Sequence, residues 1–146
     1  MQMQTRPERE FERRRLRVYV AGPISSDVFD GVHRGFAAGK QMFLDGMAPF
    51  IPHADAFWFM SQEVPGDQLW KAYLEYDLEY VSVCDAVFRL AGESKGADLE
   101  CDIAKALRIP VFTQLNPDRP LVEDVGYARL CAEAAWRELN GKQVAS

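Results

Sequence analysis

The chain has 146 residues, 48% of them hydrophobic, and a formal net charge of −5 at pH 7. This length and hydrophobic content predict one domain with a substantial core. The acidic balance argues against a general nucleic-acid binder, and no stretch is apolar enough to predict a membrane span or a signal peptide. We therefore expect a small-molecule ligand, with neither nucleic acid nor membrane as a partner.

The three cysteines, Cys84, Cys101 and Cys131, are an odd number without metal-type spacing, which predicts reduced thiols in a cytoplasmic protein and no metal site. Cys101 follows an acidic residue, and we interpret it as a small buried hydrophobe rather than a nucleophile. No Walker loop or GxGxxG sequence follows the first predicted strand. We therefore expect no cofactor.

Residues 1–15 form a charged segment that we expect to be a flexible arm, and residues 16–146 form the predicted domain. The domain opens with a strand from Leu16 to Ala21, followed by a loop and a helix from about Phe29 to Leu44. The loop begins with Gly22 and Pro23, and ligands gather at such strand ends in parallel sheets. Gly22, Pro23 and Ser25 are therefore candidate ligand contacts.

Two further features of this first unit allow alternative interpretations. Tyr19, near the strand end, is either a core aromatic or a phenol that reaches a neighbouring carboxylate. Gly31, Gly35 and Gly39 are spaced four apart, which favours close packing of the helix on a neighbour.

A short second strand, Met47 to Ile51, contains Pro49 and is followed by Pro52, so we expect it at a sheet edge. The next segment carries His53 and an aromatic cluster with Trp58. This cluster is either a lid over a planar ligand or an oligomer contact. His53 is a candidate ligand contact or proton carrier.

The remaining elements alternate in type. We predict a helix from Asp67 to Val83 and a strand from Ala86 to Leu90, then a helix from Ala97 to Leu107, a strand from Pro110 to Gln114 and a helix from about Val122 to Leu139. This order predicts an α/β flavodoxin-like fold, a doubly wound parallel sheet of four or five strands with helices on both faces. The site is expected at the carboxyl ends of the first and third strands.

Two acidic residues interrupt apolar helix faces. Asp77 lies in the stripe of Trp70, Tyr73 and Leu74, and Glu100 shares a face with Ala97, Ile103, Ala104 and Leu107. A buried carboxylate needs a partner or a function. The structural alternative pairs these acids with Arg89, Lys95 or a backbone N–H. The start of a helix favours an ionised Glu100, which suits a nucleophile or base.

Several segments together resemble the nucleoside 2-deoxyribosyltransferase superfamily, and most closely its small members that begin with a YxAGP strand. The segments are residues 18–23 (VYVAGP), 76–78 (YDL), 84–86 (CDA), 94–100 (SKGADLE) and 109–111 (IPV). The resemblance implies cleavage of an N-glycosidic bond. In that family a glutamate like Glu100 forms a covalent glycosyl-enzyme, an aspartate like Asp77 handles the base, and a tyrosine like Tyr19 holds the glutamate.

The residue six before the nucleophile separates branches of this family, since the related 2'-deoxynucleoside 5'-phosphate N-hydrolases have a serine there that binds phosphate. Ser94 takes this place, and with Lys95 and Gly96 it opens a helix that suits a phosphate. The phosphate hydrolases carry a serine at the position of Pro23 and an arginine at the position of Ser25, so this chain departs from them at both positions. We expect a hydrolase of nucleoside 5'-monophosphates. The alternatives are a base-exchanging transferase and a non-catalytic nucleotide-binding module. The resemblance also implies a homodimer or higher homo-oligomer.

Overall fold

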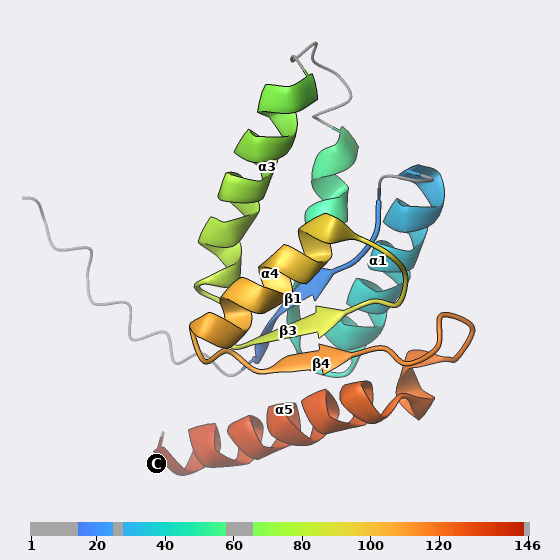
Figure 1. The fold of residues 1–146 in the computed structure, drawn as a ribbon. Helices are drawn as coiled ribbons and strands as arrows, with labels where there is room; N and C mark the ends of the chain where they lie inside the picture. Colours follow the sequence, from blue (N-terminus) through green and yellow to red (C-terminus); the bar gives the residue numbers. More distant parts are fainter. Residues whose placement is uncertain (1–14, 25–27, 58–65, 145–146) are drawn as a thin grey trace, which may run out of the picture.

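The centre of the molecule is a four-stranded parallel sheet with the strand order β2-β1-β3-β4 (Figure 1). The computed structural model describes residues 15–24, 28–57 and 66–144. Its elements, in chain order, are β1 (Arg17–Ala21), α1 (Val28–Leu44), β2 (Ala48–Phe50), η1 (Pro52–Asp55), α3 (Gly66–Val81), β3 (Ala86–Arg89), α4 (Lys95–Ala106), β4 (Val111–Thr113), η2 (Leu121–Glu123) and α5 (Val125–Val144).

This arrangement confirms the predicted flavodoxin-like fold. Strands and helices alternate along the chain, and β1 lies between β2 and β3, so the chain reverses its winding direction at β1. Strand β2 is a short edge strand, as its proline content predicted. None of the helices in the described ranges is long and apolar enough to cross a membrane.

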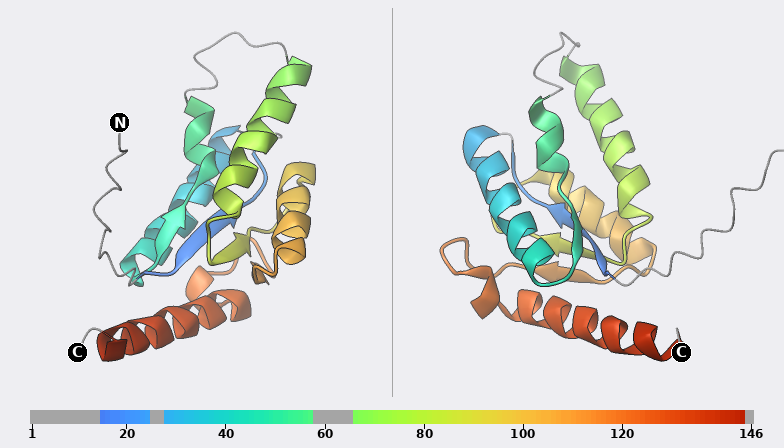
Figure 2. Two further views of the ribbon diagram at one scale, coloured as in Figure 1. Left: turned by 90° about the vertical axis from the view of Figure 1, so that its left-hand side faces the viewer. Right: turned by 180° about the vertical axis from the view of Figure 1, so that it is seen from behind.

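Helices cover both faces of the sheet (Figure 2). On one face, Val18, Val20 and Phe88 pack with Met42 of α1 and Leu130 of α5. Side chains that alternate with these strand residues point to the other face, where α3 and α4 lie. There the cluster contains Tyr19, Ala21, Val87, Val81, Ala97, Cys101 and Ala104. Residue Tyr19 therefore points toward the two helices that carry the predicted acids.

The glycines of α1 let this helix lie close to the segments that follow β1 and β2. A Cβ atom at Gly31 would come within 2.7 Å of the Pro23 carbonyl oxygen. One at Gly35 would lie 2.6 Å from the ring of His53, and one at Gly39 would lie 2.1 Å from Ile51. The predicted close packing is thus confirmed, and Gly35 makes the space that His53 occupies.

One position of α4 differs from the prediction. Leu107 was expected on the inward face, but its side chain is 51% exposed. The helix ends at Ala106, and the next residues turn away from the helical path, since Arg108 has a φ of 61°. The helical periodicity that placed Leu107 inward therefore no longer applies at that residue.

Candidate functional site

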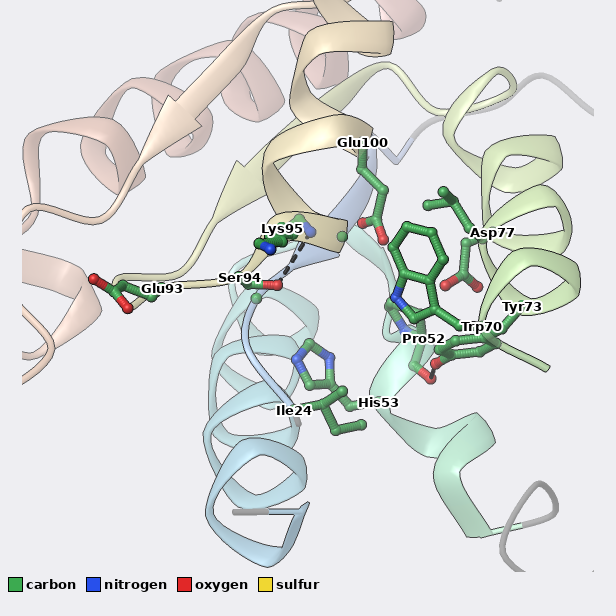
Figure 3. Close-up of a pocket in the computed structure, with 14 residues that line it drawn as sticks. Ile24, Pro52, His53, Trp70, Tyr73, Asp77, Glu93, Ser94, Lys95 and Glu100 are labelled. Carbon is green, nitrogen blue, oxygen red and sulfur yellow. Dashed lines mark hydrogen bonds between the residues drawn. The ribbon is translucent and has the colours of Figure 1, made fainter. Parts of the chain in front are cut away.

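A cavity of about 410 Å³ opens at the carboxyl ends of β1 and β3, where the fold predicted a site. It lies between the loop after β1, the start of η1, one face of α3, and the loop and first turns of α4 (Figure 3). The predicted site residues that line it are Gly22, His53, Asp77, Ser94, Lys95, Gly96 and Glu100.

Two buried carboxyl groups face this cavity from different helices. Glu100 of α4 is 7% exposed and Asp77 of α3 is 2% exposed, and Figure 3 shows both side chains turned toward the same space. Oδ1 of Asp77 has no hydrogen-bond partner among the described residues. Arg89 binds Asp98 at 3.0 Å and the carbonyl groups of Leu90 and Gly92 instead of either acid. Arg89 therefore forms no ion pair with either acid in the described structure, although its positive charge lowers the pKa of Glu100.

Both carboxyl groups hold their protons more tightly than an exposed acid does. Burial, and next the negative charge of Asp77, raise the pKa of Glu100 to about 8. Burial and the charge of Asp55 raise the pKa of Asp77 to about 7. The expectation of an ionised Glu100 near the helix start is corrected here. Desolvation outweighs the helix dipole, which contributes at most about 2 kcal/mol even in favourable geometry.

The phenol of Tyr19 is fully buried and lies close enough to both acids to interact with their charges. Its ring stacks on Phe50 with centroids 5.6 Å apart, so it is a core aromatic. Interaction with its hydroxyl group lowers the pKa of Asp77 and of Glu100, although the hydroxyl makes no hydrogen bond of ordinary geometry within the described structure. Burial raises the pKa of Tyr19 far above its usual value, so this hydroxyl acts only as a proton-bearing donor.

His53 forms another part of the cavity wall and is 3% exposed. Burial and the positive charge of Arg34 lower its pKa to about 4, so the imidazole is neutral at physiological pH. Neither ring nitrogen has a hydrogen-bond partner among the described residues. A neutral imidazole has one donor and one acceptor, but both nitrogens of this ring are buried, so His53 borders the cavity with its ring and not with an exposed nitrogen.

The start of α4 forms the wall opposite α3. Oγ of Ser94 accepts a hydrogen bond of 3.1 Å from the N–H of Ala97, which caps the helix and explains why α4 begins at Lys95, two residues before the predicted start. The Ser94 hydroxyl still has its own proton to donate. A Cβ atom at Gly96 would meet nothing within 4 Å, so this residue borders open space.

Residues 16–113 match the model of the family described as Domain of unknown function (DUF4406). The chain belongs to this family. The matched segment runs from β1 to β4 and contains every described residue that lines the cavity. None of the curated proteins matches the chain.

Four predicted site residues of this DUF4406 domain do not line the cavity or cannot be placed. Tyr19 lies in the core beside the cavity and is not part of its lining. The ring of Pro23 packs against the loop before α4, because a Cβ atom added at Gly92 would lie 2.9 Å from this ring. Ser25 and Trp58 lie outside the described residues.

The aromatic residues of α3 were predicted as part of an apolar stripe and not as site residues. Trp70, Tyr73 and Leu74 line the cavity together with Asp77, one or two helical turns further along. The hydroxyl of Tyr73 donates a 2.8 Å hydrogen bond to the carbonyl of Pro52, which ties α3 to the segment after β2. Trp70 is 55% exposed. Helical spacing from Asp77 places these residues on its face of the helix, but core residues have the same spacing, so the sequence did not mark them as part of a site.

The other residue types that could carry chemistry, thiols and metal ligands, do not add to the site. Cys101 is 6% exposed, and burial raises its pKa to about 11, which fits the predicted unreactive thiol. Within the described ranges, no three His, Cys, Asp or Glu side chains are grouped so that they could hold a metal ion. The site is therefore best described as two acids, a neutral histidine and a capped helix start around one cavity.

Proposed function

We propose that this protein cleaves the N-glycosidic bond of a nucleoside 5'-monophosphate and releases the free base. The observation that carries the proposal is the pair of buried acids, Asp77 and Glu100, which come from separate helices and face one cavity. Paired carboxyl groups suit a reaction with an oxocarbenium-like transition state. The resemblance of the sequence to the nucleoside 2-deoxyribosyltransferase superfamily assigns the same two residues to catalysis.

In the first step a carboxylate oxygen of Glu100 attacks the anomeric carbon of the sugar. A C–O bond forms, the C–N bond to the base breaks, and the electron pair of that bond goes to the base. Asp77 donates its proton to the departing base, so that the base leaves as a neutral molecule. The product of this step is a sugar ester of Glu100.

In the second step water attacks the same carbon. Asp77, now ionised, takes a proton from the water, and the ester C–O bond breaks to regenerate the Glu100 carboxylate. The hydroxyl of Tyr19 acts as a fixed donor close to Glu100, where it stabilises the negative charge whenever that carboxylate is free.

This mechanism needs one proton on the pair of carboxyl groups. With a pKa of about 7 for Asp77 and about 8 for Glu100, the pair holds a single proton at intermediate pH. The productive arrangement has that proton on Asp77. A bound base favours this arrangement, because its ring nitrogen accepts a hydrogen bond from a protonated carboxyl group but not from a carboxylate.

The phosphate of the substrate would bind at the start of α4. The first N–H groups of a helix point outward without partners in the helix, and the dipole favours an anion there. Ser94 adds a hydroxyl donor and Lys95 adds a positive charge on the same wall. The half-exposed indole of Trp70 provides a flat surface at the side of the cavity on which a base can stack.

Chromatography of the reaction products tests the function. The protein is incubated with a panel of nucleosides and their 5'-monophosphates, and free base is quantified. We expect base release from monophosphates, its loss in Glu100→Gln, and a selective increase of KM for monophosphates in Lys95→Gln. Formation of a new nucleoside when a second base is added would instead identify a transferase. Binding of nucleotide without base release would identify a non-catalytic module.

We also propose a homo-oligomer, as the family resemblance implies. Helix α5 presents Trp136 and Leu139 to solvent, each with 64% of its side chain exposed, and large apolar residues of this kind are typical of subunit contacts. Small-angle scattering of the full chain measures the mass in solution. A monomeric mass at all concentrations would exclude this proposal.

A further inference from the structure

A second cavity, of about 300 Å³, lies on the opposite side of the sheet from the first, where α1 and the segment between β4 and α5 meet. It shares no described lining residue with the first cavity. Its polar wall consists of Arg34 and Gln41 from α1, Gln114 after β4, and Arg119 in the segment that leads to α5. Its volume is at the lower end of the range for small-molecule sites.

The charge of this cavity is opposite to that of the chain as a whole. The chain has a net charge of −5, yet both charged residues in the described lining of the second cavity are arginines. Two arginines in the lining of one concave surface give it a positive potential that favours an anion. Their planar N–H groups match the oxygen atoms of a phosphate or a carboxylate.

The second cavity is also connected to the first through the loop between β3 and α4. Arg34 donates a 2.7 Å hydrogen bond to the carbonyl of Ala91, and Oε1 of Gln114 accepts a 3.0 Å bond from the N–H of the same residue. Both backbone groups of Ala91 are thus held by residues that line the second cavity. The loop then continues to Ser94 and Lys95, which line the first cavity.

We propose that this second cavity is an anion site that binds inorganic phosphate or a phosphate monoester between Arg34 and Arg119. A bound anion neutralises the two arginines and fixes the guanidinium of Arg34. The bond from Arg34 to Ala91 then restrains the loop that leads to the first cavity. The site is distinct from the phosphate position proposed at the start of α4, and its test does not depend on glycosidase activity.

Isothermal titration calorimetry with inorganic phosphate tests this site in the full chain. The variant Arg119→Gln removes one guanidinium from an exposed position, so the fold is expected to persist. The matched control is Arg129→Gln, which removes an exposed arginine from α5, away from the cavity. We expect phosphate to bind about ten-fold more weakly to Arg119→Gln, and equally well to the wild type and Arg129→Gln.

The variant Lys95→Gln separates the two anion positions. Phosphate bound in the second cavity keeps its affinity in Lys95→Gln, whereas phosphate bound at the start of α4 loses it. A parallel titration with a nucleoside 5'-monophosphate, in the Glu100→Gln background that prevents turnover, distinguishes a monoester from free phosphate as the ligand. A second binding event that disappears in Arg119→Gln assigns the monoester to this cavity.

Hydrogen exchange at the Ala91 N–H reports the connection to the loop. Phosphate is expected to slow this exchange in Lys95→Gln and to leave it unchanged in Arg119→Gln. The proposal is overturned if Arg119→Gln binds phosphate as tightly as Arg129→Gln, if the affinity depends on Lys95 instead, or if neither phosphate nor the monoester binds.

Discussion

Replacement of Glu100 by glutamine should stabilise the fold, and the gain should depend on pH. Burial raises the pKa of Glu100 from 4.5 to about 8 in the folded chain. Below pH 4.5 both the folded and the unfolded state hold the proton, so the carboxyl group costs no stability. As pH rises toward 8 only the unfolded state releases it, and folding stability is lost.

This pKa difference corresponds to roughly 5 kcal/mol at about 1.4 kcal/mol per pKa unit. The glutamine amide is itself buried without a hydrogen-bond partner, which lowers the free energy of unfolding by about 1–3 kcal/mol at every pH. We therefore expect Glu100→Gln to be about 2–4 kcal/mol more stable than the wild type near pH 8, with this advantage gone near pH 5. Urea unfolding at the two pH values measures the difference. An equal effect at both pH values would refute the raised pKa of Glu100.

Three further outcomes follow from the geometry of the cavity. The profile of kcat/KM against pH should be bell-shaped, with its maximum between about pH 7 and 8. Below this window both acids are protonated, and above it Asp77 has no proton to donate. A flat profile from about pH 5 to pH 9 would contradict the mechanism. Gly35→Ala should lower the free energy of unfolding by about 1–3 kcal/mol, since its Cβ atom would meet the ring of His53 at 2.6 Å. Gly96→Ala should leave urea unfolding unchanged or improve it by up to about 1 kcal/mol, because its Cβ atom meets open space, while nucleotide affinity measured by calorimetry falls. Equal destabilisation by the two glycine substitutions would contradict the described packing.

The fold could be predicted from the sequence because its signals are local. Alternating strand and helix patterns specify the parallel sheet and its crossovers, and the prolines near β2 mark it as an edge strand. The ends of the elements were less predictable. Because Ser94 caps α4, the helix begins at Lys95, two residues before the start that its hydrophobic pattern indicates. The helix ends at Ala106, so Leu107 does not pack inward.

The site was predictable in part, because an acid inside an apolar stripe is visible in the sequence. That signal found Asp77 and Glu100, which both line the cavity. It did not distinguish Trp70 and Tyr73 from core residues, since a cavity wall and a core face have the same helical spacing. The protonation of Glu100 was also beyond the sequence, because burial depends on residues from β1 and α3 that lie far away along the chain.

The proposed role of Glu100 as a nucleophile is tested most directly by mass spectrometry, which detects the covalent intermediate that this role requires. The protein is mixed with the nucleoside 5'-monophosphate that gives the most free base in the chromatographic assay, quenched rapidly with acid, digested and analysed. We expect the peptide that contains Glu100 to gain the mass of the sugar phosphate, and Glu100→Gln to show neither this adduct nor base release. Base release at the wild-type rate by Glu100→Gln, or an adduct on another peptide, would contradict the mechanism.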